Sequence, residues 1–334
     1  MPTATTSTAP RTPVRGPLFD AAIAPGGYAW WYVDALSADR RHGLTVIALL
    51  GSVFSPYYAR ARRRDPAADP LQYCAMNVAL YGDTGHRWAM TERGAANVRR
   101  EPHALRIGPS ALRWDGQTLQ VDIDEVTVPW PRRLRGRLRV TPRALFDERH
   151  RLDAAGRHRW QPIAPRASVE VEFGQPDWRW QGDAYVDCND GDRGLEEDFD
   201  AWTWSRTGHG TETQVFYDVA GREGDAAQLA LSFDDAGGSR RLATPPEVTL
   251  PRTPWGIERP TRADAAGMAR VLATLEDGPF YARSLVASQL EGRPALSIHE
   301  SLSLRRFRQG WVRMLLPFRM PRRVSRASPG TGEP

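Results

Sequence analysis

The feature that most constrains the fold is a repeated alternation of apolar and polar residues with a period of two. In "LQVDIDEVTV" (119–128), the side chains of Leu119, Val121 and Ile123 point to one side and the residues between them point to the other. The same alternation recurs in "GRLRV" (136–140), "SVEVEF" (168–173) and "AQLALSF" (227–233). Turn-forming runs such as "DGQ", "GQPD", "NDGDRG" and "DDAGG" separate the segments. Many short strands joined by close turns predict an all-β barrel or sandwich.

The last part of the chain has a different period. Within "SLSLRRFRQGWVRMLLPFRMPRR" (301–323), apolar residues recur at helical spacing, at Leu304, Phe307, Trp311 and Leu315, with arginines between them. Pro317 is expected to end or kink this helix near Leu316. A short basic helix with aromatic residues on its apolar side is typical of a membrane contact. It is equally typical of a terminal helix that packs on the body of the protein.

The positive charge is concentrated in this tail. The 334 residues carry 45 basic and 40 acidic side chains, a net charge of +5, and every basic residue is an arginine. Residues 299–334 contain eight Arg and two Glu, which gives 8 − 2 = +6 and leaves 5 − 6 = −1 for the rest. A body with that balance lacks the basic face of a nucleic-acid-binding protein, so we expect no nucleic acid partner.

Several other classes of protein find little support. The longest apolar run, residues 44–54, has about half of the roughly 20 residues that a membrane span needs. Residues 1–19 contain no hydrophobic signal segment and are expected to be a disordered lead-in, as residues 324–334 are expected to be a disordered end. Cys74 and Cys188 provide no disulfide framework, which favours an intracellular setting. The seven histidines show no paired metal spacing and no phosphate-binding loop follows a strand, so neither a metal nor a nucleotide is expected.

Four residues in the middle of the chain are the first candidates for chemistry. If 157–161 and 184–188 are strands, His158 and Trp160 share one face, as do Tyr185 and Asp187. The neighbours of the second pair, at 184 and 186, are apolar and face the other way, which indicates that the pair looks into an interior. An aspartate surrounded by aromatic rings loses solvation, so its pKa should rise and it can donate a proton. The simpler interpretation is an aspartate that caps the following turn beside ordinary core aromatics.

Two further groups of residues compete for a functional role. Trp202 and Trp204 follow four acidic residues within 196–200. This pattern is typical of a glycosidase cleft but also of a solvated turn. The blocks 26–37 and 51–66 are rich in aromatic residues, among them Trp30, Trp31, Tyr57 and Tyr58. Such density suits the lining of a long apolar ligand channel, or an aromatic core.

A series of long, unusual blocks follows in order from about residue 20 to residue 323. These blocks are "GGYAWWYVDALS", "GLTVIALLGSVFSPYYARARRR", "CAMNVALYG", "RWAMTERG", "IGPSALRWDG", "GRHRWQPIAP", "GDAYVDCNDG", "LEEDFDAWTWSR" and "LPFRMPRR". Together they resemble the carotenoid 1,2-hydratases, also called hydroxyneurosporene synthases, of phototrophic and related bacteria.

The resemblance implies a lipocalin-like tandem β-barrel and a cofactor-independent hydro-lyase. Such an enzyme adds water to the terminal C1=C2 double bond of an acyclic carotene and is associated with the membrane that dissolves its substrate. The chain is therefore expected to divide into a lead-in, two lipocalin-like β-domains, a basic amphipathic tail that contacts the membrane, and a disordered end: residues 1–19, 20–170, 171–298, 299–323 and 324–334.

The resemblance also carries the central cluster through "HRW" and "YVD". Asp187 is then the proton donor, and Tyr185, His158 and Trp160 orient it, stabilise a carbocation or handle water. Trp202, Trp204, Trp30, Trp31, Tyr57 and Tyr58 are candidates for binding the polyene. Two alternatives remain from the residues alone: a non-catalytic lipocalin-like carrier, which needs no acid in its pocket, and a β-rich glycosidase with two cooperating carboxylates. The oligomeric state is not determined by the sequence.

Overall fold

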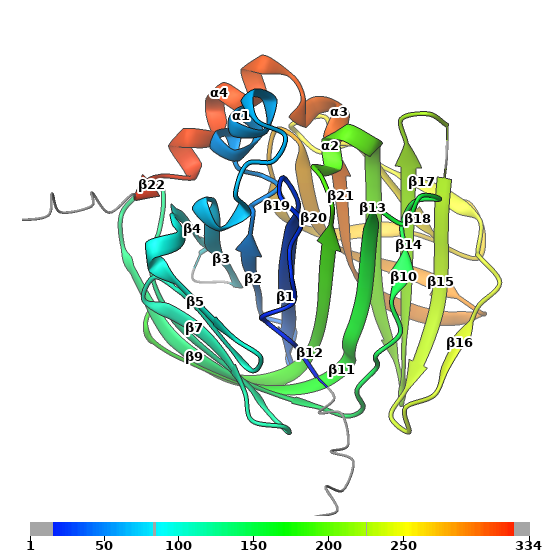
Figure 1. The fold of residues 1–334 in the computed structure, drawn as a ribbon. Coiled ribbons are helices and arrows are strands. Elements are labelled where there is room, and N and C mark those ends of the chain that lie inside the picture. The colour runs from blue at the N-terminus through cyan, green and yellow to red at the C-terminus, as the bar shows by residue number, and fades with distance from the viewer. Residues whose placement is uncertain (1–15, 83–84, 225, 324–334) are drawn as a thin grey trace, which may run out of the picture.

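The computed structural model describes residues 16–82, 85–224 and 226–323. Most of this chain forms two large antiparallel sheets that lie side by side (Figure 1). The predicted all-β fold is confirmed, and the segments of period-two alternation lie in strands, except that residues 127 and 128 follow the end of their strand. The expected disordered segments fall largely outside the described residues. Of the expected lead-in, Phe19 is described, and it is fully buried against Trp31.

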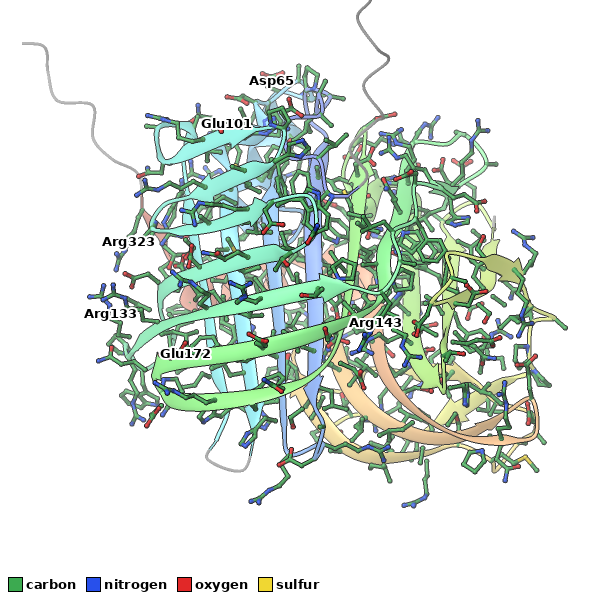
Figure 2. All side chains as sticks on the ribbon, turned by 90° about the horizontal axis from the view of Figure 1, so that it is seen from below. Asp65, Glu101, Arg133, Arg143, Glu172 and Arg323 are labelled. Carbon is green, nitrogen blue, oxygen red and sulfur yellow. The ribbon has the colours of Figure 1, made fainter. Side chains whose placement is uncertain are left out.

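The first sheet has 13 strands and curls into a half-barrel (Figure 1). Its order is β22-β4-β3-β2-β1-β12-β11-β9-β8-β7-β6-β5, and β10 pairs with β11. The strands are β1 Tyr28–Ser37, β2 His42–Leu50, β3 Cys74–Gly82, β4 Arg87–Arg93, β5 Val98–Glu101, β6 Ala104–Ile107, β7 Ser110–Trp114, β8 Leu119–Val126, β9 Arg133–Pro142, β10 His150–Arg151, β11 His158–Gln175, β12 Asp177–Gly191 and β22 Arg322–Arg323. Arg133 begins β9 at the end of the strand that lies away from the second sheet. Arg143, just beyond the other end of β9, lies near the second sheet (Figure 2).

The second sheet has seven strands in the order β16-β15-β14-β13-β21-β20-β19. They are β13 Phe199–His209, β14 Glu212–Gly221, β15 Ala226–Asp234, β16 Ser239–Arg241, β19 Arg270–Asp277, β20 Tyr281–Leu290 and β21 Arg293–Ser303. A separate pair is formed by β17 Glu247–Leu250 and β18 Arg259–Arg262. The change from one sheet to the other comes between Gly191 and Phe199. Residue 170 lies inside β11, so the expected domain boundary there does not coincide with the boundary between the sheets.

Alternation along β1 gives the molecule two cores. Trp31 and Val33 point into the hollow of the first sheet, where they pack with aliphatic residues of its other strands. Trp30 and Tyr32 point the other way and pack against the second sheet. Because successive side chains of a strand point to opposite faces, the same strand supplies a dry aliphatic core on one side and an aromatic interface on the other. The candidate site lies in this interface.

Helices cover one end of the interface (Figure 1). They are α1 Pro56–Arg64, α2 Leu195–Asp198, α3 Leu304–Phe307 and α4 Gly310–Arg319, with short 3-10 turns at Pro70–Gln72 and Ala95–Asn97. None of the helices in the described part of the chain combines the length and the apolar character that crossing a membrane requires.

The expected single tail helix was wrong, because this segment forms two helices, and the second does not end at Pro317. The chain breaks between α3 and α4, where Arg308 donates to the carbonyls of Glu196 and Phe199 over 3.1 and 3.0 Å. The second helix then continues through Pro317 to Arg319, because burial of residues on its inner face offsets the one backbone hydrogen bond that a proline removes. Residues 299–303, assigned to the tail from sequence, are the end of strand β21.

Candidate active site

Two identical Tyr-Val-Asp triplets lie on neighbouring strands of the first sheet. One is residues 32–34 on β1 and the other is residues 185–187 on β12. The strands are antiparallel, so Tyr32 pairs with Asp187 and Asp34 pairs with Tyr185. Both tyrosines belong to the aromatic core between the sheets, and the aspartates two residues along each strand share that face. The two triplets therefore place two carboxyl groups in one buried interface.

Asp187 is held by hydrogen bonds on only one of its oxygens. The indole Nε1 of Trp160 and the hydroxyl of Tyr185 each donate to Oδ2 over 2.8 Å. The other oxygen, Oδ1, is buried and receives no hydrogen bond from any described residue. Burial raises the pKa of Asp187 to about 7, even though the bonds from Trp160 and Tyr185 lower it. Oδ1 can thus carry an acidic proton that meets no acceptor among the described residues.

His158 lies on the same face as Trp160 but bonds to other partners. Its Nδ1 is 2.9 Å from the hydroxyl of Tyr28, and its Nε2 is 2.8 Å from Oδ2 of Asp198. Burial lowers the pKa of His158, although Asp198 raises it. Burial also raises the pKa of Asp198, but hydrogen bonds from Arg193 and His158 outweigh this and lower that pKa to about 2. Both ring nitrogens of His158 are therefore engaged away from Asp187.

Asp34 has cationic partners that Asp187 lacks. Arg206 on β13 and Arg283 on β20 both donate to its carboxylate from the second sheet. Arg283 also donates to Glu300 on β21, and to the hydroxyl of Tyr32 over 2.6 Å. That hydroxyl donates in turn to Oε1 of Glu300 over 2.7 Å. These five buried side chains form one network in which each carboxylate meets a guanidinium.

An apolar cavity of about 120 Å³ lies between the sheets beside the two triplets. It extends along the first sheet from β4 to β1 and along the second from β13 to β19, and the inner face of α4 closes one side. Trp30, Tyr32 and Trp202 form its wall next to the triplets, and Glu300 lines it there. Asp187 does not line the cavity, because it lies one strand further on, on β12.

The aromatic candidates fall into different places. Trp30 and Trp202 line the cavity, with ring centroids 6.1 Å apart. Trp204 lies behind the cavity wall, where it contacts the rings of Tyr32 and Tyr185.

The remaining three candidates lie away from the cavity. Trp31 points into the hollow of the first sheet, on the opposite face of β1. Tyr57 and Tyr58 belong to α1, where Tyr58 donates to the carbonyl of Gly27 over 2.7 Å and Arg322 lies over the ring of Tyr57. A role for any of the six in binding a polyene stays a prediction.

The acids at 196–200 lie outside the cavity and are paired with arginines. Glu196 bonds to Arg62 over 2.9 Å, and Asp200 bonds to Arg308. Because cations hold these carboxylates, they lack the open geometry of a pair that flanks a sugar. Within the part of the chain that the structure describes, no group of three or more His, Cys, Asp or Glu side chains is arranged to hold a metal ion.

Three polar residues of the site were not singled out from the sequence. Asp34 could have been found, because "YVD" occurs twice and the second copy had already been noted. Glu300 and Arg283 carried no such signal, since their importance comes from strands that pair only in the folded chain.

Comparisons with known proteins agree with the resemblance noted in the sequence. The family model described as "Carotenoid hydratase CrtC" matches residues 46–329. An acyclic carotenoid 1,2-hydratase of Thiocapsa roseopersicina is 54% identical over 311 residues, covering 93% of this chain and 76% of that protein. Another, of Rubrivivax gelatinosus, is 50% identical over 310 residues, covering 92% and 76%.

Among solved structures, a protein of Nitrosomonas europaea described as an AttH superposes with a TM-score of 0.57 at 16% identity. The match covers 89% of this chain and 99% of that one. At this identity the likeness concerns the fold alone, and it bears out the predicted lipocalin-like arrangement of two curled sheets in tandem.

Proposed function

Because this chain belongs to the family of CrtC carotenoid hydratases, which are hydro-lyases, we propose that it adds water to the terminal C1=C2 double bond of an acyclic carotene. Neurosporene and lycopene are the candidate substrates, and the product is a tertiary 1-hydroxy-1,2-dihydro carotenoid. The observation that carries this proposal is the Asp187 carboxyl group, which is buried, lacks a cationic partner and has a pKa raised to about 7.

The chemistry requires such an acid. An isolated trisubstituted alkene is a very weak base, so the proton must come from a carboxylic acid held in a dry site. Delivery to C2 leaves a tertiary cation at C1, which the ring faces of Trp30, Tyr32 and Trp204 would stabilise. Water then attacks C1. No step of this sequence calls for a cofactor.

The residues around Asp187 fit supporting roles. Trp160 and Tyr185 fix the carboxyl through Oδ2 and leave Oδ1 to carry the proton. His158 acts indirectly, through a hydrogen bond to Tyr28. The ring of Tyr28 stacks on Trp30, with the two ring centroids 5.0 Å apart. His158 is in this view a positioning residue for the aromatic wall. The terminal double bond must pass that wall to reach Asp187, so the side chain of Trp30 or Trp202 must shift when substrate binds.

We further infer that the protein takes its substrate from a membrane surface. The cavity has room for the end of a carotene but not for the whole polyene, so most of the chain must stay outside it. Helix α4 lines the cavity through Leu316 and Met320, while Met314 (72% exposed) and Phe318 (78% exposed) face outward. An apolar helix face flanked by arginines suits peripheral binding to anionic lipid.

A non-catalytic carotenoid carrier with the same fold is the alternative function. It would use the cavity and its aromatic wall but would have no need for the buried, unpaired acid at Asp187. A carrier would bind the carotene and release it with its mass unchanged.

Product analysis of cells that make lycopene or neurosporene tests the proposal. The parent chain is expected to yield a more polar pigment heavier by one water. Asp187→Asn keeps an oxygen that accepts the bonds from Trp160 and Tyr185, so we expect it to fold while hydration falls at least about 100-fold, the usual contribution of a general acid.

Asp190→Asn is the matched control, because Asp190 lies on the same strand but bonds to Arg159 rather than into the interface. It should retain hydration. Normal turnover by folded Asp187→Asn would contradict the assignment of the acid. No new pigment with the parent chain, despite folded protein and membranes, would favour the carrier.

A further inference from the structure

The structure points to a second catalytic carboxylate: we propose that Glu300 accepts the proton released when water attacks C1. This inference rests on the function proposed above. Glu300 lies on β21 of the second sheet and lines the cavity, whereas Asp187 lies on β12 of the first sheet. The two carboxyl groups approach the same interface from opposite sheets, so one can deliver a proton to C2 while the other receives the proton of the water that attacks C1.

The hydrogen bonds of Glu300 leave one oxygen available. The hydroxyl of Tyr32 and Nη1 of Arg283 both donate to Oε1. Among the described residues we find no donor to Oε2. Because the residue lines the cavity, this oxygen can accept a hydrogen bond from a water molecule held there. Water placed by Glu300 would lie beside Tyr32, which pairs directly with Asp187.

Asp187 and Glu300 have opposite surroundings. The carboxyl group of Asp187 accepts two bonds from neutral donors and meets no guanidinium, which favours the protonated form. The carboxylate of Glu300 forms an ion pair with the guanidinium of Arg283. A carboxyl group that meets only neutral donors and a second one that is paired with a cation are suited to act as acid and base in one reaction.

Other bases in the region fit less well. Both ring nitrogens of His158 are within hydrogen-bonding distance of Tyr28 and Asp198, and His158 does not line the cavity. Glu276 does line it, but on β19, the edge strand of the second sheet, where it accepts a bond from Tyr81 over 3.1 Å and lies 3.8 Å from Arg319. Asp34 is occupied by two arginines.

The proposed cycle is balanced in atoms and charge. The proton of Asp187 forms the new C2–H bond and the π electrons leave C1 as a tertiary cation. The oxygen of water forms the C1–O bond and one of its protons passes to Glu300. A proton then returns from Glu300 to Asp187 through water in the site, so both groups regain their starting states and one water is consumed.

Hydration and isotope exchange in D₂O separate the two roles. Purified parent, Glu300→Gln and Asp187→Asn are incubated with lycopene in liposomes, and product and recovered substrate are examined by mass spectrometry. We expect Glu300→Gln to lose hydration by about 100-fold or more, the usual contribution of a general base. It should still place deuterium on the recovered alkene, because Asp187 can protonate C2 and take a proton back.

Glu125→Gln is the matched control, because Glu125 is also a buried glutamate paired with an arginine, Arg93, but does not line the cavity. It should hydrate at a rate of the same order as the parent. Asp187→Asn should lose both hydration and exchange. If Glu300→Gln does not fold, Glu300→Asp keeps the charge beside Arg283. It is expected to fold, to lose part of the hydration and to retain exchange.

Three outcomes would overturn the role of Glu300. They are parental hydration by folded Glu300→Gln, equal losses in the Glu125 and Glu300 variants, and loss of exchange together with hydration in Glu300→Gln. A merely structural role would lower the melting temperature without separating exchange from hydration. Failure of the proposed function gives a different result, since hydration and exchange would then be absent from the parent itself.

Discussion

At the scale of single residues, the partner of a buried carboxyl group decides its chemistry more than burial does. Asp34 and Asp187 are each preceded by Tyr-Val in the sequence. They lie on adjacent strands, and both are buried. Arg206 and Arg283 meet the first, so it serves as an ionic anchor. Only neutral donors meet the second, so burial dominates and the pKa of Asp187 rises to about 7.

This pKa predicts the pH dependence of the reaction. Only the protonated form of Asp187 can deliver a proton, and that form is depleted as the pH rises through about 7. We therefore expect kcat/KM for hydration to be constant at lower pH and to fall about tenfold per pH unit well above 7. The measurement is initial rates from pH 5.5 to 9 with substrate in liposomes. A rate that rises across this range would contradict Asp187 as the acid.

At the scale of secondary-structure elements, α4 has an apolar residue on nearly every side. Its inner face buries Val312 and Leu316 against the core and the cavity. Its outer face exposes Trp311, whose ring stacks on Trp255 with an interplanar angle of 12°, together with Met314 and Phe318. This exposed apolar patch, on a helix that also closes the cavity, is the surface through which we propose contact with lipid.

Replacing the outer apolar residues should weaken membrane binding without unfolding the body. The double variant Met314→Glu/Phe318→Glu is expected to lower partitioning onto anionic vesicles about tenfold or more in a co-sedimentation assay. Met268→Glu provides the control, because Met268 is an exposed methionine in a turn that belongs to no helix. The double variant should still hydrate detergent-solubilised substrate at the normal rate. Unchanged vesicle binding by the folded double variant would exclude α4 as the docking surface.

At the scale of the whole molecule, the two sheets are joined by aromatic packing and by a buried ionic network. Asp34 comes from the first sheet, and its partners Arg206 and Arg283 come from the second. A buried pair adds little compared with good apolar packing, but removing one partner leaves the other charge uncompensated. The network therefore holds the two sheets in one relative position, and replacing any single member is expected to lower the stability of the fold.

The variant Asp34→Asn is predicted to lower the free energy of unfolding by about 3 kcal/mol or more, because the buried guanidinium of Arg206 loses its counter-charge and that of Arg283 keeps only Glu300. Chemical denaturation followed by tryptophan fluorescence measures the change. Asp124→Asn is the matched control, since Asp124 pairs with Arg133 on the exposed face of β8 and β9. A surface pair contributes at most about 1 kcal/mol. Equal effects of the two variants would contradict a structural role for the network.

The sequence by itself determined the local structure and the side on which residues lie. The alternation at 119–124 and the spacing of Tyr185 and Asp187 gave strands and shared faces, and the structure confirms both. Trp30 and Trp31 were both candidates for binding the polyene, but neighbours on one strand point to opposite faces, and of these two only Trp30 borders the cavity. These properties follow from backbone geometry over a few residues, which is why they can be read without the fold.

Only the tertiary structure decided which residues meet. Tyr32 and Glu300 are 268 positions apart, and Tyr28 and His158 are 130 positions apart, yet each pair is joined by a hydrogen bond. The break between α3 and α4 likewise depends on Arg308 reaching carbonyl groups more than 100 residues earlier. The periodicity of a short segment cannot predict such contacts, because they form only when the two sheets pack and exclude water. Burial without a cation, which sets Asp187 apart from Asp34, is a property of that packing.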